Sequence, residues 1–138
     1  MRNRVLELLR KSGNEAISGE EISRQLEISR TAVWKHIQTL KNEGYEIDSL
    51  PKRGYILRVV PNRLYPQEIT NHLQTKWLGR AICYNDSIDS TNNLGKTIAN
   101  QGCPDGLLLV AEEQGAGKGR LSRGWISPYA KGLWFSVV

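Results

Sequence analysis

The sequence lacks several features that would place it in particular protein classes. No apolar run approaches the length of a membrane-spanning helix, and residues 1–5 contain no apolar signal-peptide core. There is no low-complexity tract and no internal repeat. The two cysteines, Cys83 and Cys103, lack metal-ligand spacing, so we expect no metal site and treat them as small apolar residues. These absences predict a cytoplasmic globular protein with reduced thiols and no membrane partner.

Positive charge is concentrated in the first half of the 138-residue chain. Residues 1–64 carry 12 Lys and Arg against 8 Asp and Glu, whereas residues 65–138 carry 7 against 6. This asymmetry favours a polyanion partner for the first half and a different role for the second. A stretch with proline at both ends, residues 61–66, is typical of a linker. We therefore predict two domains, at residues 1–62 and 63–138.

Three helices are predicted before the first strand. The first spans residues 3–11, where apolar residues recur at helical spacing. Ser18 is the expected N-cap of the second helix, and Glu21 completes a capping box. The third begins at Ser29, and Gly44 supplies the left-handed residue past its end. Only two or three residues separate the second helix from the third, and so short a connection forces the corner of a helix-turn-helix.

The third helix has two different faces. Its apolar residues Val33, Ile37 and Leu40 are predicted to face inward. The opposite face and the N-cap are predicted to contact DNA through Ser29, Arg30, Thr31, Trp34, Lys35 and Gln38. These side chains crowd the N-terminal half of the helix, which is the part that enters a major groove. The alternative is a small helical domain that binds protein or nothing, with its charges merely solvated.

A β-hairpin is predicted after the third helix. Alternating residues 45–50 and 55–59 flank a turn of Pro51, Lys52, Arg53 and Gly54. Such a hairpin forms a wing, and the two cations at its tip would contact the sugar-phosphate backbone without reading sequence. Because the wing, the capping pattern and the charge asymmetry agree, DNA binding is the favoured interpretation of the first domain.

The second half alternates between strand and helix patterns. A helix is expected from residue 67 to about 78, with Pro66 in its first turn. Further elements are predicted as a strand at 81–85, a helix from Ser90-Thr91-Asn92 to near Gly102 whose inward face is Leu94, Ile98 and Ala99, a buried strand at 107–113, and a strand from Gly132. This order indicates an α/β or α+β domain. Taken alone, the Ser-Thr-Asn run is only a helix start.

Residues 115–125 combine four glycines with the cations Lys118, Arg120 and Arg123 and are predicted to form a loop. Glycine allows backbone N–H groups to approach a ligand closely, and the cations attract anions to the same place. The spacing matches neither the P-loop nor the dinucleotide fingerprint. A loop that grips a phosphate or carboxylate and a solvated basic loop are both compatible with this pattern.

The order of these motifs resembles a known family. The chain contains, after the winged helix-turn-helix, Asp89-Ser90-Thr91-Asn92, Ala111-Glu112-Glu113-Gln114, Gly117-Lys118-Gly119-Arg120 and Trp125-Ile126-Ser127-Pro128. In this order they resemble the bifunctional biotin–protein ligases, also called biotin operon repressors. The resemblance implies an α+β chain, in which a winged helix-turn-helix precedes the start of a mixed α/β catalytic domain. It also implies ATP (with Mg²⁺) and biotin as substrates and biotinyl-5′-AMP as the intermediate. The biotinyl group then passes to a lysine of a biotin carboxyl carrier protein, and the adenylate favours a homodimer that binds operator DNA.

The resemblance also implies roles for individual residues. Biotin is expected to contact Ser90, Thr91, Asn92, Gln114, Gly117, Lys118, Gly119 and Arg120. Arg120 and Lys118 are the expected catalytic cations, because adenylation builds negative charge on the α-phosphate. Arg123 and Trp125 are expected to form an adenylate loop. The sequence departs from the family where Lys118 replaces a usual Arg and Ser122 replaces a usual Gly, which removes a bidentate donor and restricts the loop.

The family's catalytic domain continues past the last residue of this chain, with a Lys-Trp-Pro-Asn-Asp-like segment and a small β-barrel. We therefore expect the chain to be a C-terminally cut piece with little ligase activity of its own. Two alternatives remain. One is a DNA-binding regulator whose second domain senses a small molecule without catalysis. The other is a transferase that uses lipoate, against which the winged helix argues.

Overall fold

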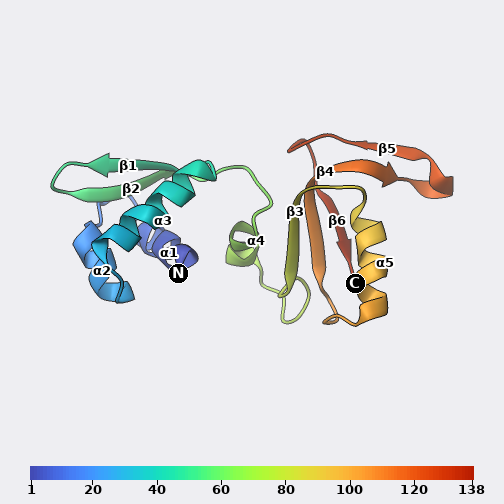
Figure 1. Cartoon of the computed structure of the whole chain (residues 1–138), viewed down its shortest axis with the longest axis horizontal. Helices are drawn as coiled ribbons and strands as arrows, with labels where there is room; N and C mark the ends of the chain where they lie inside the picture. Colours follow the sequence, from blue (N-terminus) through green and yellow to red (C-terminus); the bar gives the residue numbers. More distant parts are fainter. The chain divides into compact units, whose positions relative to one another are not determined.

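The computed structural model describes residues 1–138 and divides into two compact units, Met1–Pro61 and Asn62–Val138 (Figure 1). No helix combines the length and apolar character that crossing a membrane requires. No group of three or more His, Cys, Asp or Glu side chains is arranged to hold a metal ion.

The first unit has three helices followed by a two-stranded antiparallel hairpin. Its elements are α1 (Arg2–Lys11), α2 (Gly19–Leu26), α3 (Arg30–Asn42), β1 (Glu46–Leu50) and β2 (Gly54–Val59). The predicted helices and wing are confirmed. The predicted inward face of α3 is also confirmed, because Val33, Ile37 and Leu40 are fully buried. They pack in a core with apolar residues of α1, α2 and the hairpin.

Side-chain caps fix where α2 and α3 begin. The Oγ atom of Ser18 accepts the Glu21 N–H at 3.0 Å, and the Oγ atom of Ser29 accepts the Ala32 N–H at 3.1 Å. Each such cap stabilises a helix by about 1 kcal/mol. The predicted capping box is only half formed, since the Glu21 carboxylate accepts hydrogen bonds from Arg24 and Gln25 instead. A guanidinium one turn along the helix is a stronger partner for a carboxylate than a single backbone N–H.

The hairpin is attached to the segment that precedes α2. Ile17 and Tyr55 exchange both backbone hydrogen bonds, at 3.0 and 2.9 Å. Gly54 makes this contact possible. It has a φ of 113°, and a Cβ at this position would lie 2.1 Å from the Ile17 carbonyl oxygen. The root of the wing is thereby held beside the start of α2, which positions the exposed turn residues Lys52 and Arg53.

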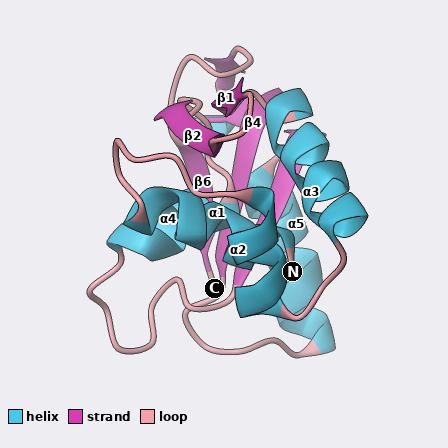
Figure 2. Cartoon of the chain, turned by 90° about the vertical axis from the view of Figure 1, so that its left-hand side faces the viewer, coloured by secondary structure: helices cyan, strands magenta, loops and turns pink.

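The second unit is a four-stranded mixed sheet with helices. Its elements are α4 (Pro66–His72), β3 (Ile82–Ile88), α5 (Thr91–Gln101), β4 (Leu108–Lys118), the 3₁₀ turn η1 (Arg120–Ser122), β5 (Gly124–Ser127) and β6 (Trp134–Val137). The long strand β4 is parallel to β3 and pairs antiparallel with β6 along its first half and with β5 along its second (Figure 1). Figure 2 shows β4 beside β6 among the strands in magenta. Helix α5 packs on β4 and β6. Gly95 allows this close packing, because a Cβ there would meet the Leu109 side chain at 3.1 Å.

The predicted glycine-rich loop at residues 115–125 is wrong as secondary structure. Strand β4 continues through Lys118, the chain turns in η1, and β5 returns beside it as a hairpin that extends away from the rest of the sheet (Figure 1). Gly117 pairs with Trp125, where a Cβ would lie 2.7 Å from the Trp125 carbonyl oxygen. Glycine therefore marks a close backbone approach within a strand here, which a sequence cannot distinguish from a loop.

Two helix predictions in the second unit also need correction. Helix α4 ends at His72 rather than near residue 78, and the chain then turns at Gly79, whose φ is 71°. The inward face of α5 was misassigned. Thr91 and Gly95 are buried, Leu94 and Ile98 are half-buried, and Ala99 is exposed. The helix begins at Thr91, and this start sets the phase that turns Thr91 and Gly95 toward the sheet.

Candidate functional site

The candidate ligand site lies where β3 ends, α5 begins and β4 passes beside them. Ile88 at the end of β3 pairs in register with Gln114 of β4. Ser90 then caps α5 by accepting the Asn93 N–H at 3.4 Å. The carboxyl ends of neighbouring parallel strands are a common place for ligand sites in mixed sheets. Because α5 starts at this edge, its first residue Thr91 lies directly beside Gln114.

A chain of hydrogen bonds links four side chains at this edge. The Thr91 N–H and hydroxyl lie 2.9 and 3.1 Å from the Oε1 atom of Gln114. The Nε2 atom of Gln114 donates to the Ser127 Oγ atom at 3.0 Å, and the Thr91 and Ser136 hydroxyls lie 2.9 Å apart. Thr91 and Ser127 are each only 3% exposed, so these bonds are shielded from water. The structure thus brings together Thr91 and Gln114, which the sequence placed in one site.

Two of these four hydrogen-bonded side chains, Ser127 and Ser136, were not predicted as site residues. Ser127 was noted only as part of a sequence motif, and Ser136 was assigned no role. The available signal for Ser136 was a hydroxyl residue inside an otherwise apolar strand of Leu, Trp, Phe and Val. The structure leaves Asn92, a predicted biotin contact, exposed on the first turn of α5.

The β4–β5 hairpin borders an open pocket of about 490 Å³ next to these hydrogen-bonded side chains. It is lined by residues 113–117 and 124–128, among them Gln114 and Ser127. Gly117 is buried in the hairpin, and a Cβ on it would lie 2.9 Å from the Ser127 Oγ atom and 3.2 Å from the Gln114 Nε2 atom. Only a residue without a side chain leaves the Gln114–Ser127 hydrogen bond intact.

The three predicted cations lie along the same hairpin. Lys118, Arg120 and Arg123 are exposed and form no ion pair, and Gly119 is half-buried between them. Trp125, 59% exposed, lies on β5. None of the three lines the pocket, but cations without an ion pair on the same hairpin can attract a phosphate or a carboxylate.

The tip of the hairpin holds two residues in an unfavourable conformation. Leu121 and Ser122 both have a φ of 58°. The left-handed region costs a residue with a side chain about 1–2 kcal/mol. Ser122 is therefore strained at the position where the sequence predicted a restricted loop.

One acidic group stands at the start of α5. The side-chain amide of Asn93 donates to the Asp89 carboxylate at 3.1 Å. This bond, the Ser90 backbone N–H and the positive charge of Lys118 hold the pKa of Asp89 below its usual value. Asp89 is therefore a fixed negative charge near Lys118.

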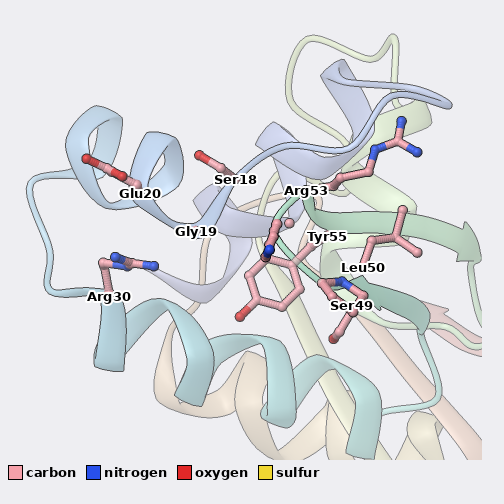
Figure 3. Close-up of a pocket in the computed structure, with 11 residues that line it drawn as sticks. Ser18, Gly19, Glu20, Arg30, Ser49, Leu50, Arg53 and Tyr55 are labelled. Atoms are coloured by element: carbon pink, nitrogen blue, oxygen red, sulfur yellow. The ribbon is translucent and has the colours of Figure 1, made fainter.

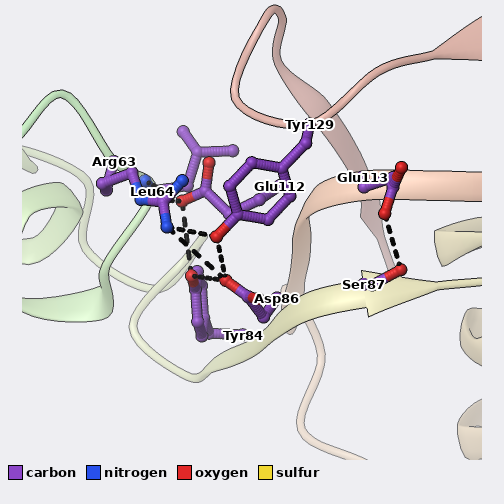
Figure 4. A network of polar contacts seen from close by, with 8 residues as sticks. All are labelled: Arg63, Leu64, Tyr84, Asp86, Ser87, Glu112, Glu113 and Tyr129. Atoms are coloured by element: carbon purple, nitrogen blue, oxygen red, sulfur yellow. Dashed lines mark hydrogen bonds and ion pairs between the residues drawn. The ribbon is translucent and has the colours of Figure 1, made fainter. Parts of the chain in front are cut away.

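A second polar network, shown in Figure 4, was not predicted from the sequence. Glu112 on β4 is 1% exposed, and its carboxylate accepts the Leu64 N–H at 2.8 Å. The Arg63 Nε atom lies 4.0 Å from that carboxylate, and the Arg63 guanidinium stacks on the Tyr129 ring at 4.4 Å and donates to its hydroxyl. Tyr129 in turn donates to the Asp86 carboxylate at 2.6 Å. The network ties residues 63–64 to the strand that carries Gln114.

The charges of this network perturb the pKa of two of its members. Burial opposes the charged form of Arg63, but its hydrogen bonds to Tyr129 and Tyr65 and the charge of Glu112 raise its pKa above the usual value. Burial and the nearby carboxylates of Glu112 and Asp86 raise the pKa of Tyr84. Arg63 therefore stays charged and Tyr84 stays neutral across the physiological range.

The first unit presents a basic concave surface. A cavity of about 430 Å³ is lined by Arg30 at the start of α3, by Lys52 and Arg53 of the wing, and by Glu20 of α2. Figure 3 shows Arg30 and Arg53 on different sides of this cavity, with Tyr55 between them. The remaining predicted DNA contacts are exposed on α3 or its cap, except for the half-buried Gln38: they are Ser29, Thr31, Trp34 and Lys35.

Comparisons with known proteins match both units. Residues 2–56 match a family model described as an HTH domain, and residues 84–138 match the Biotin/lipoate A/B protein ligase family. Over all 138 residues the chain is 43% identical to the bifunctional ligase/repressor BirA of Bacillus subtilis (strain 168), of which it covers 42%. It is 33% identical over 131 residues, 91% of its length, to the protein of that name from Escherichia coli (strain K12), of which it covers 38%.

A solved biotin protein ligase from Aquifex aeolicus, in complex with biotin and ATP, is 34% identical over 41% of this chain and 22% of its own, with a TM-score of 0.36. The chain thus spans about 42% of the length of the Bacillus relative it matches. It is similar over its whole length to the bifunctional ligase/repressor of Bacillus subtilis, and the two family models match residues 2–56 and 84–138.

Proposed function

We propose that this chain supplies the DNA-binding unit and part of the biotin-activating site of a biotin–protein ligase that also represses transcription. The substrates are biotin and ATP as its Mg²⁺ complex, and the acceptor is a lysine of a biotin carboxyl carrier protein. The observation that carries the proposal is the buried chain of Thr91, Gln114 and Ser127 beside a hairpin with three unpaired cations. The match of this segment to the Biotin/lipoate A/B protein ligase family supports it. We place both activities in the cytoplasm, where ATP, DNA and carrier protein meet.

The chemistry has two steps. A carboxylate oxygen of biotin attacks the α-phosphorus of ATP, the bond from that phosphorus to the bridging oxygen breaks, and pyrophosphate leaves. The neutral amine of the carrier lysine then attacks the acyl carbon of biotinyl-5′-AMP, AMP leaves with the bonding electrons, and the nitrogen releases one proton to solvent. Negative charge grows on the α-phosphate in the first step, and the cations Lys118 and Arg120 stabilise it. Arg123 and Trp125 line the adenylate in this scheme.

The polar groups of the site suit the ureido ring of biotin. That ring presents one carbonyl and two N–H groups within a small, otherwise apolar bicycle. Ser90 keeps its hydroxyl proton after accepting the cap bond from Asn93, so it can donate to a carbonyl. The buried Thr91 adds a hydroxyl oxygen that can accept from a ureido N–H, and the half-buried Gln114 adds an amide N–H. Asn92 lies at the same helix start, and Gly117 and Gly119 allow the backbone to approach the ligand.

The first unit reads DNA in this proposal. Arg30, Thr31, Trp34, Lys35 and Gln38 enter the major groove from α3, with Ser29 at its start, and Lys52 and Arg53 contact phosphates from the wing. Binding of the adenylate favours a homodimer, so that two copies contact a two-fold operator.

Pyrophosphate release tests the enzymatic part. These 138 residues replace the corresponding part of the Bacillus relative, and the chimera is incubated with ATP and either biotin or lipoate. We expect release with biotin alone, and its loss in the Gln114→Ala variant but not in the Lys76→Ala variant, whose exposed lysine lies outside the site. Biotin binding without pyrophosphate release would indicate a ligand-sensing regulator instead. Pyrophosphate release with lipoate would indicate that biotin is not the specific acyl substrate.

A further inference from the structure

The direction of the hydrogen bonds at the site follows from one group that cannot change its role. The backbone N–H of Thr91 is a donor only, and it lies 2.9 Å from the side-chain amide of Gln114. The atom that receives this bond must be the amide oxygen Oε1. The backbone N–H at the start of α5 therefore decides which end of the Gln114 amide faces Thr91.

The hydroxyl groups then have only one consistent arrangement. Because Oε1 of Gln114 only accepts, the Thr91 hydroxyl at 3.1 Å gives it its single proton. The Thr91 oxygen is then left as an acceptor. The contact of 2.9 Å between the Thr91 and Ser136 hydroxyls consequently has Ser136 as the donor. The order runs from Ser136 to Thr91 to the Gln114 carbonyl.

The other end of the Gln114 amide faces the hairpin. Its Nε2 atom donates one proton to the Ser127 Oγ atom at 3.0 Å and retains a second N–H. Ser127 receives that bond and keeps its own hydroxyl proton. Both residues line the cavity of about 490 Å³, so the arrangement leaves donors at its wall.

We propose that Ser136 is a positioning residue for the ligand site. By donating to Thr91 it commits the Thr91 hydroxyl proton to Gln114. This second bond to Oε1 holds in place the amide that the Thr91 backbone N–H orients, with one N–H of Nε2 available to a ligand carbonyl. This assignment rests on the proposed function, in which that carbonyl belongs to the ureido ring of biotin. Without Ser136, no hydroxyl donates to the Thr91 oxygen, and the Thr91 hydroxyl is free to rotate away from Gln114.

Nuclear magnetic resonance on the 138-residue chain, together with calorimetry of biotin binding by its chimera with the Bacillus relative, tests this role. The variants are Ser136→Ala, which removes the donor, and Ser136→Thr, which keeps it. The matched control is Ser87→Ala, which removes a serine hydroxyl from β3, on the other side of β4, where it donates only to Glu113. We expect Ser136→Ala to shift the Gln114 side-chain amide and Thr91 backbone N–H signals and to weaken biotin binding about five- to tenfold, the effect of one hydrogen bond. Ser136→Thr is expected to retain the original signal positions and biotin affinity, and Ser87→Ala is expected to change neither the signals nor the affinity.

A second variant covers the case in which Ser136→Ala does not fold. Gln114→Glu keeps an oxygen for both bonds from Thr91 but removes the N–H that faces the cavity. We expect it to retain the Thr91 N–H signal near its original position. Its biotin affinity should fall at least tenfold, because the ligand carbonyl is buried without a hydrogen-bond donor. Undiminished biotin binding by this variant would overturn the proposal.

The spectroscopic and binding results separate the two hypotheses. Unchanged Gln114 amide signals in Ser136→Ala, or a Ser136→Thr variant that behaves like Ser136→Ala, would overturn the role of Ser136 whatever the ligand. If the amide signals follow the expected pattern while the chimera with the Bacillus relative binds no biotin, the direction of the hydrogen bonds is supported and the proposed function is wrong.

Discussion

Replacing Gly117 by alanine is expected to disrupt the candidate ligand site and destabilise the second unit. The added Cβ would lie 2.7 Å from the Trp125 carbonyl oxygen, 2.9 Å from the Ser127 Oγ atom and 3.2 Å from the Gln114 Nε2 atom. Two of these contacts are too short for any side chain, so the β4–β5 pairing or the Gln114–Ser127 bond must give way. Overpacking of this kind costs about 1–3 kcal/mol, and a buried hydrogen bond left unsatisfied costs about 1–3 kcal/mol more.

Gly115 provides the matched control two residues earlier on the same strand. A Cβ there would meet only the Ile88 carbonyl oxygen, at 4.0 Å. Gly115→Ala is therefore expected to be neutral or to stabilise by up to about 1 kcal/mol, through the reduced freedom of the unfolded chain. Urea unfolding followed by the indole signals of Trp125 and Trp134, together with calorimetric titration of biotin, measures both effects. Equal stability and equal biotin affinity in the two variants would refute the packing argument.

Further predictions concern the hairpin tip and the DNA-facing surface. Ser122→Gly relieves a left-handed serine and should raise the free energy of unfolding by about 1 kcal/mol in thermal melts, whereas a loss of stability would contradict the strain. Arg120→Ala should accelerate dissociation of biotinyl-5′-AMP, measured in a stopped-flow competition experiment; an unchanged rate would remove Arg120 from the phosphate site. Lys52→Ala should lower affinity for all DNA sequences and reduce the salt slope by about one, while Arg30→Ala should lower it mainly for the operator, by about 1–3 kcal/mol. Identical salt slopes for Lys52→Ala and the unmodified chain in gel-shift titrations would exclude a phosphate contact from the wing.

The elements of the first unit could be predicted because their signals are local. Ser18 and Ser29 cap helices through bonds to residues three positions later, and the apolar stripe of α3 recurs every three or four residues. Gly54 could also be predicted as a turn residue, but its contact with Ile17 could not be predicted. Such signals need only a short window of sequence.

The second unit was predicted less well because its decisive contacts are distant in sequence. Leu64 and Glu112 are 48 positions apart, and Thr91 and Ser136 are 45 apart. No periodicity relates these residues, so the buried network around Glu112 and the place of Ser136 emerge only from the sheet topology. Gly117 shows a different failure, since glycine signals both flexible loops and close backbone contacts inside strands.

A titration of biotin into the isotopically labelled chimera of this chain with the Bacillus relative, followed at the Thr91 backbone N–H and the Gln114 side-chain amide, tests the central claim most directly. The account predicts a saturable shift of these two signals with biotin and none with lipoate. Millimolar biotin that leaves both signals in place would contradict it.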